Sequence, residues 1–192
     1  MAALVAAGLA GAAGGCGGGE ASNPVIPITT TPPAGRETLT VPSSAMEPTL
    51  HCARPAAGCE AARSDRIVFE EPVEDPRRGD VIVFRAPPAA AERCGAGGTF
   101  VKRLIGLPGE TVREQSGIVF VDGKKLDEPY VNAGRRDHES GTWHVPEGKY
   151  FLMGDNRSQS CDSRHWGTVA RDALLGKVVQ IVRAESRRDG SE

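Results

Sequence analysis

Residues 100–110 read Phe-Val-Lys-Arg-Leu-Ile-Gly-Leu-Pro-Gly-Glu, and this stretch sets the expected fold class of the chain. Apolar and β-branched residues predict a strand over residues 100–105, and Gly106 with Pro108-Gly109 ends it. Similar short apolar runs lie before and after it. Turn signals such as Arg78-Gly79-Asp80 and Asp122-Gly123 separate them, and Asp-Gly is typical of a hairpin turn. The pattern predicts a mainly β fold.

The other expected strands share this short, apolar and partly β-branched character. They span residues 67–69, 81–84, 111–113, 118–121, 124–126, 143–145, 150–153 and 178–182. Strands at intervals of about 8–12 residues, with turns between them, are typical of an all-β barrel or sandwich. A helix signal is confined to residues 170–175, and it predicts a short helix there.

Composition agrees with this fold class. The 192 residues include 24 Gly and 14 Pro, and aromatic residues make up only 5% of the chain. Such a mixture favours short strands and many turns over a helical bundle. The formal net charge is −2, and Lys and Arg are spread along the sequence. No nucleic-acid partner is therefore expected.

The amino terminus differs from the rest of the chain. Residues 1–16 are interpreted as an apolar anchor or a lipoprotein-type signal. The uncharged run is shorter than the roughly 20 residues of a membrane-spanning helix, and it lacks a basic n-region. Either a gene start placed too far downstream has truncated an anchor, or Ala-Gly-Gly-Cys16 is a lipoprotein box. Both interpretations place the body outside the cytoplasmic membrane, whereas a disordered tail would fit a cytosolic protein.

Two further segments complete the expected domain organisation. Residues 17–36 are rich in Gly, Pro, Thr and Ser, which predicts a flexible linker. Residues 37–192 contain the apolar runs and are expected to form one folded domain.

The five cysteines leave several arrangements open. Cys52 and Cys59 lie seven positions apart in a Pro- and Gly-rich stretch, so they can close a loop. Cys94 and Cys161 can form a second pair, which would leave Cys16 alone. Reduced thiols fit the sequence too, since connectivity does not follow from sequence. A zinc site near residues 51–59 would need spacings that match no common pattern.

Four segments, in this order along the chain, resemble the motifs of type I signal peptidases. Residues 41–50 read Val-Pro-Ser-Ser-Ala-Met-Glu-Pro-Thr-Leu and resemble the family's nucleophile box, Ser-Met-x-Pro-Thr. The other three are residues 78–84 followed by Pro87, residues 101–110, and Met153-Gly154-Asp155-Asn156-Arg157 followed by Ser160, Asp162-Ser163-Arg164 and Trp166-Gly167. The resemblance covers residues 39–180.

This resemblance implies both a fold and an activity. It implies a signal-peptidase-like coiled β-sheet or barrel core, with a small β insertion within residues 113–145 that carries no catalytic residue. It also implies a membrane-associated serine endopeptidase, with residues 37–192 as catalytic domain on the extracytoplasmic face of the cell membrane. Its substrates would be exported preproteins with small residues at the cleavage site. No metal or organic cofactor is implied.

The resemblance breaks at the residue that would attack the substrate. In the family this is the serine just before the methionine, but here that position holds Ala45, which has no nucleophilic atom. By carry-over, the Ser43 hydroxyl and the backbone N–H of residue 45 would form the oxyanion hole. A backbone donor survives the change to alanine.

The remaining site residues are carried over from the other motifs. Lys102 would be the general base, because burial disfavours the ammonium form and lowers the pKa of a lysine. Arg103 would alternate to the other face of the strand and stay in solvent. Ser160 would orient the Lys102 amine, and an Asp162–Arg164 ion pair would brace the loop. Two further residues are expected to hold the turn, Asp155 and Arg157.

Ala45 leaves three hypotheses open. Ser44 serves as a displaced nucleophile, which requires an altered backbone because neighbouring strand residues point to opposite faces. Alternatively, the protein is a catalytically silent relative that binds exported peptides without cutting them. The third hypothesis is that the alanine is not native. A self-cleaving Ser-Lys repressor is a poor alternative, because residues 1–36 do not resemble a basic DNA-binding helical unit.

Overall fold

The computed structural model describes residues 23–183, which form two β-sheets and a few short helices. The strands of the larger sheet are β1 (Ile28–Thr29), β2 (Leu39–Thr40), β3 (Arg66–Glu70), β4 (Val81–Arg85), β5 (Thr99–Gly106), β10 (Lys149–Met153), β11 (Val169–Ala170) and β12 (Leu174–Val182). Their order is β11-β10-β5-β4-β12-β3-β2, and β1 adds to β12. The expectation of a mainly β fold is confirmed.

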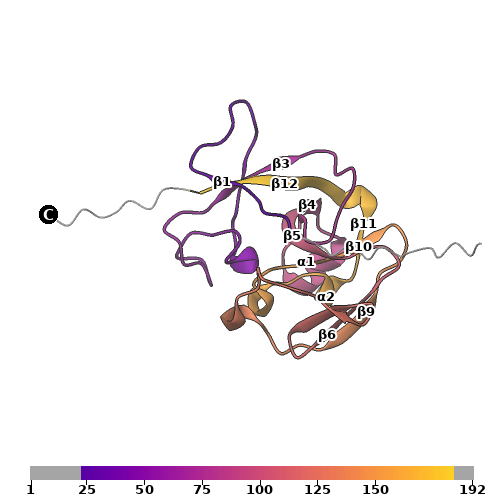
Figure 1. Cartoon of the computed structure of the whole chain (residues 1–192). Helices are drawn as coiled ribbons and strands as arrows, with labels where there is room; N and C mark the ends of the chain where they lie inside the picture. The colour runs from indigo at the N-terminus through magenta and orange to yellow at the C-terminus, as the bar shows by residue number, and fades with distance from the viewer. Residues whose placement is uncertain (1–22, 184–192) are drawn as a thin grey trace, which may run out of the picture.

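The smaller sheet lies apart from β3 and β12, at the bottom of Figure 1. Its order is β8-β7-β6-β9, all antiparallel. The strands are β6 (Thr111–Gln115), β7 (Ile118–Val121), β8 (Lys124–Lys125) and β9 (Gly141–His144). This sheet coincides with the expected β insertion. The Asp122-Gly123 turn also forms as expected, because both residues have positive φ, 47° and 77°.

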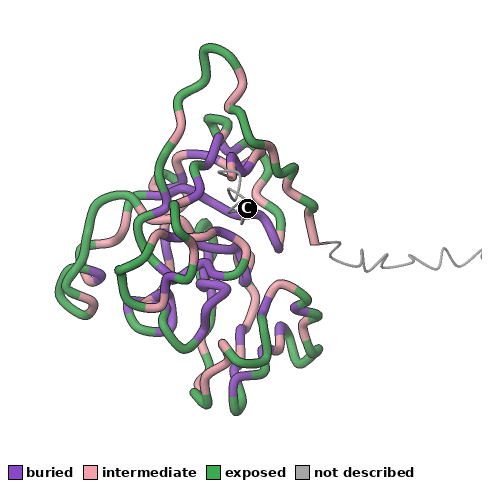
Figure 2. The backbone as a smooth tube through the Cα atoms, turned by 90° about the vertical axis from the view of Figure 1, so that its left-hand side faces the viewer, coloured by how far each residue is buried: buried purple, intermediate pink, exposed green. Residues whose placement is uncertain are grey.

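Strand β5 lies between β4 and β10 in the larger sheet. Lys102 is paired with Ile82 of β4, and Arg103 is paired with both Val81 of β4 and Met153 of β10. The second half of β5 is buried. Figure 2 shows buried backbone, in purple, through the centre of the molecule. Two consecutive basic residues thus occupy the middle of the sheet.

The short helices differ from the expectation. They are α1 (Pro88–Cys94), α2 (Ser163–Trp166) and the 3-10 helices η1 (Ser44–Met46), η2 (Ala133–Arg135), η3 (Arg157–Gln159) and η4 (Arg171–Ala173). The short helix expected over residues 170–175 forms only as the 3-10 turn η4, because β11 ends at Ala170 and β12 begins at Leu174. Pairing of β12 with β3 and β4 outweighs local helix propensity there.

Helix α1 was not expected, although its sequence carries helix signals. Pro88 occupies the first turn, alanines follow, and Gly95 ends the helix with a φ of 67°. Proline at the start and a left-handed glycine at the end are the usual boundaries of a helix.

Part of the expected linker is attached to the larger sheet. Ile28 and Thr29 pair in parallel with Ile181 and Val182 of β12. The domain boundaries at residues 16 and 36 stay predictions. The expected anchor over residues 1–16, with Cys16, lies outside the described residues. Within residues 23–183, no helix is both long and apolar enough to cross a bilayer.

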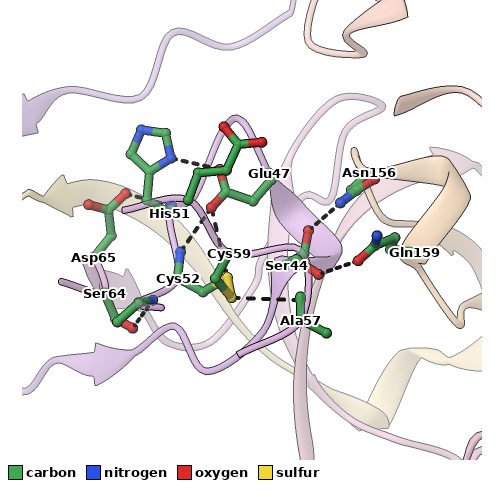
Figure 3. The surroundings of a disulfide bond; sticks show 12 residues. Ser44, Glu47, His51, Cys52, Ala57, Cys59, Ser64, Asp65, Asn156 and Gln159 are labelled. Atoms are coloured by element: carbon green, nitrogen blue, oxygen red, sulfur yellow. Dashed lines mark hydrogen bonds and ion pairs between the residues drawn. A yellow bond between two sulfur atoms is a disulfide. The ribbon is translucent and has the colours of Figure 1, made fainter. Parts of the chain in front are cut away.

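Both cysteine pairs that the sequence allows are disulfides in the structure. Cys52–Cys59 closes a loop beside η1 (Figure 3), with its Cα atoms 5.1 Å apart. Cys94–Cys161 joins the end of α1 to the loop before α2, with its Cα atoms 6.1 Å apart. A cross-link between distant segments restricts the unfolded chain and so stabilises the fold.

Candidate functional site

A groove of about 500 Å³ is lined by residues of β2, β5 and η1. Residues 39–43 form one wall, and residues 99–102 form another. The Cys94–Cys161 disulfide, Ala96 and Gly97 line it as well. Three expected site residues face this groove together: Ser43, Ala45 and Lys102. Most of the other lining groups are apolar, so the groove suits an uncharged peptide segment.

Lys102 is the buried cation of this groove. Its residue surface is only 4% exposed, and no hydrogen bond holds its ammonium within residues 23–183. Burial lowers the pKa of Lys102 from 10.5 to about 8, although the Asp162 and Asp155 carboxylates act in the opposite direction. A lysine with this pKa releases its proton far more readily than one in water. The residue therefore has the property that a general base needs.

Position 45 is held in place by the loop after β10. The Asn156 side chain donates to the Ser44 carbonyl at 3.0 Å, and its backbone N–H donates to the Ala45 carbonyl at 3.1 Å. Within the part of the chain that is described, the Ala45 N–H and the Ser43 hydroxyl donate to no acceptor. Both expected oxyanion donors thus have no acceptor among the described residues, and both residues line the groove.

Ser44 points away from the groove. Its hydroxyl donates to Gln159 Oε1 at 3.1 Å (Figure 3), and the residue does not line the groove that holds Ala45 and Lys102. It faces the 52–59 disulfide loop, since a Cβ built on Gly58 would lie 2.7 Å from Ser44 Oγ. A displaced-nucleophile role for Ser44 would therefore require this hydrogen bond to break and η1 to turn.

Ser160 lies close to position 45 but does not bond to the lysine. Its Oγ is buried and has no hydrogen-bond partner among the described residues. The expected hydrogen bond to Lys102 is therefore absent from this structure. A Cβ on Gly154 would overlap both the Ser160 side chain and the Ala45 carbonyl. Glycine at 154 thus lets the Ser160 loop approach η1 closely.

The Asp162–Arg164 ion pair is present as expected. Arg164 Nε and Nη2 donate to the two carboxylate oxygens of Asp162 at 2.8 and 2.9 Å. Burial alone would raise the pKa of Asp162. The Arg164 hydrogen bonds and charge, with Lys102, instead hold it below its ordinary value. Asp162 also caps α2 and accepts from the Gly154 N–H at 3.0 Å. This pair fixes the loop that packs against position 45.

The expectation that Arg103 stays in solvent is wrong. Arg103 does alternate to the other face of β5, but only 3% of its surface is exposed. It donates to both carboxylate oxygens of Asp155, at 2.8 and 2.6 Å, and its guanidinium stacks 3.9 Å from the ring centroid of Tyr130. Asp155 and Tyr130 cover that face of the sheet, so the charge is paired instead of hydrated.

Arg157 has a partner that the sequence did not predict. It forms a buried ion pair with Glu128, and its Nε donates to the Gly154 carbonyl at 3.0 Å. The second contact does hold the turn, as expected for Arg157. Asp155 serves the turn indirectly, through its bond with Arg103.

Sequence reasoning missed a cluster of acids around Arg164. Glu114 of the smaller sheet lies 3.5 Å from Arg164 Nη1, Asp137 contacts the same nitrogen, and Glu139 lies 3.9 Å away. Burial raises the pKa of Glu114 from 4.5 to about 7, against the attraction of Arg164. In the sequence, only the alternation of residues along the strand over residues 111–115 hints that Glu114 points inward. The insertion therefore supports the Asp162–Arg164 brace.

The raised pKa of Glu114 predicts a pH-dependent stability. Because the folded protein holds this proton more tightly than the unfolded chain, the free energy of unfolding falls as pH rises from about 4.5 through 7. Glu114→Gln removes that loss, so we expect the variant to gain up to about 3 kcal/mol relative to the native chain between pH 5 and 8. Urea unfolding of the native chain and of Glu114→Gln at pH 5 and at pH 8 measures this difference in the free energy of unfolding. A difference that does not change with pH would contradict the assignment.

Comparison with known proteins matches the sequence of this chain to one peptidase family. The sequence model described as "Signal peptidase, peptidase S26" matches residues 34–183. The chain is 41% identical to the probable signal peptidase I-2 of Synechocystis sp. over 141 residues, which cover 72% of this chain and 59% of that relative. It is 33% identical to signal peptidase I T of Bacillus subtilis over 153 residues, which cover 73% of this chain and 70% of that relative.

A crystal structure of a signal peptidase I from Enterococcus faecalis V583 is also similar, with 34% identity and a TM-score of 0.45 over 55% of this chain and 98% of that one. The sequence matches show that this chain is related to peptidases. The chain belongs to the signal peptidase family, peptidase S26, which confirms the resemblance drawn from its motifs. It spans about three fifths of the length of the first relatives it matches.

Proposed function

We propose that this chain binds the signal peptides of exported preproteins in the groove beside Lys102. Small residues before the cleavage position would suit its apolar walls. The peptide would lie extended along residues 39–43, which include the edge strand β2. It would form hydrogen bonds with their backbone. The observation that carries this proposal is the groove itself, which Ser43, Ala45 and Lys102 line together.

We propose further that the native chain holds such peptides without cutting them. Ala45 supplies no nucleophile, and the neighbouring Ser44 donates its hydroxyl to Gln159 and does not line the groove. An endopeptidase that uses Ser44 as displaced nucleophile with Lys102 is the second candidate, favoured by the signal peptidases among its relatives. It requires the rearrangement of η1 described above.

The proposed location is the extracytoplasmic face of the cell membrane. The two disulfides support it, because such bonds persist mainly in oxidising compartments outside the cytoplasm. Residues 1–16 would anchor the chain, residues 17–36 would link it, and residues 37–192 would carry the groove. The proposed partners are exported preproteins and the cytoplasmic membrane, without nucleic acid or cofactor.

Blocking the groove tests the binding proposal. Gly97 lines it, and a Cβ there would lie 3.8 Å from the Ala91 methyl, an ordinary contact. We therefore expect Gly97→Leu to fold normally and to weaken binding of a signal-peptide segment ending in Ala-x-Ala by about tenfold or more. Fluorescence anisotropy with a labelled peptide measures the affinity, and thermal unfolding checks the fold.

The control for this variant is Ala62→Leu. Ala62 is exposed and does not line the groove, so introducing the same leucine side chain there should leave the peptide affinity unchanged. Equal affinities of the native chain and Gly97→Leu would place the peptide elsewhere.

A further inference from the structure

A second hollow lies on the other side of η1 from the groove. It has a volume of about 430 Å³ and is formed by the 47–60 segment, η2 with Asn132, and η3 with Asn156. We call it the polar hollow. Gln159 lines both the polar hollow and the groove. Its hydrogen bond with Ser44, visible in Figure 3, lies where the two spaces adjoin.

The chemistry of the polar hollow contrasts with that of the groove. Charged side chains line it: Arg135 donates to Glu60 at 2.7 Å, and His51 Nδ1 lies 2.7 Å from the buried carboxylate of Glu47. Asn132 lines it too, while its side chain caps η2. The lining thus holds two carboxylates, those of Glu47 and Glu60, beside one guanidinium and one imidazole. A polar segment, neutral or basic, fits this lining better than an acidic one.

We propose that the polar hollow binds the part of the preprotein that follows the cleavage position, the first residues of the mature chain. This rests on the proposed function, since it continues the peptide that the groove would hold. A peptide bound past position 45 would pass from an apolar to a polar surface, as its own sequence does. Gln159 is exposed, and within residues 23–183 its amide nitrogen donates to no acceptor. It can therefore donate to a peptide carbonyl at the junction.

Gly134 allows the polar hollow to be filled selectively. A Cβ built on it meets a single atom within 4 Å, Asn132 Oδ1 at 3.7 Å, and its φ is not positive. Gly134→Leu should therefore keep the backbone and occupy the polar hollow alone. Gly97→Leu, which fills the groove, is its matched counterpart.

The experiment compares two peptides on the native chain. The short one ends, as an amide, at the small residue of the cleavage site, and the long one continues for about four polar residues, or roughly 13 Å of extended chain. We expect the long peptide to bind about tenfold more tightly. Gly134→Leu should remove that gain and leave the short peptide's affinity unchanged. Gly97→Leu should weaken both.

Charge provides a second measurement that does not depend on Gly134→Leu folding. A long peptide with lysine in its extension should bind more tightly than one with glutamate, and Glu60→Lys should reverse this order. Equal affinities of the short and long peptides, or an equal effect of Gly134→Leu on both, would overturn the inference. The proposal that the groove binds signal peptides would be unaffected. Failure of both peptides to bind would instead refute the proposed function itself, and the inference with it.

Discussion

Replacing Ala45 with serine is expected to give this chain a signal-peptide-cleaving activity on the order of a million-fold above that of the native protein. The loss of a serine nucleophile in subtilisin costs about that factor, or roughly 8 kcal/mol of transition-state stabilisation. The gain should be comparable because the other groups already surround position 45. Lys102 lines the same groove, and the Ser43 hydroxyl and the backbone N–H of residue 45 are free to donate.

In the Ala45→Ser protein the new hydroxyl would attack the peptide carbonyl while the Lys102 amine takes its proton. The two free donors would stabilise the oxyanion, and the proton would pass to the leaving amine as the peptide bond breaks. Water would then hydrolyse the acyl-enzyme. Because the pKa of Lys102 is about 8, kcat/KM should rise with pH through that value.

Mass spectrometry of a signal-peptide substrate measures this gain, with Ala45→Ser/Lys102→Met as the inactive control. The double variant keeps the new hydroxyl but lacks the base. An Ala45→Ser protein that binds the peptide as tightly as the native chain and still yields no product would show that the base and oxyanion donors are misplaced.

Replacing Arg103 with methionine is expected to cost about 3–5 kcal/mol of unfolding free energy, the range for breaking a buried ion pair by removing one partner. The change leaves the Asp155 carboxylate buried, with Thr49 Oγ1 at 2.5 Å as its remaining side-chain partner. Methionine matches the length of the arginine stem, so the lost charge dominates the effect. For a chain of this size the melting temperature should fall by roughly 10 °C.

The matched control is Arg36→Met. Arg36 pairs with Glu70 at 3.5 Å, but both side chains are at least half exposed, 50% and 57%. Solvent screens such a pair, so its removal should cost less than about 0.5 kcal/mol. Differential scanning calorimetry of both variants measures the contrast. A similar loss in the two would mean that Arg103 is hydrated in solution.

The fold was largely predictable because its signals are local. The alternation and turn residues around 100–110 and 118–126 predict strands and a hairpin from a few neighbouring residues, and these elements form. Tertiary pairing shortens what a local signal predicts at residues 170–175, where the helix is limited to the 3-10 turn η4 because β12 begins at Leu174. Helix α1 has local signals too, with Pro88 in its first turn and Gly95 at its end.

The site was predictable only in part, because its charges are paired over long distances in sequence. The motifs identify Lys102, Ser160, Asp162 and Arg164 as candidates. They do not show that Arg103 meets Asp155, which lies 52 positions away. Nor does strand alternation show that Glu114 approaches Arg164. The direction of the Ser44 side chain depends on the 3-10 turn of η1 and on Gln159, and neither follows from a strand pattern.

The most direct test of our account measures binding and cleavage together on the native, unmodified chain. Purified protein is mixed with a signal-peptide substrate, its dissociation constant is determined, and product is quantified by mass spectrometry beside the Ser44→Ala and Lys102→Met variants. We predict that the native chain binds the peptide and forms no more product than either variant. Turnover by the native chain that is lost in both Ser44→Ala and Lys102→Met would contradict this account and establish Ser44 as the nucleophile.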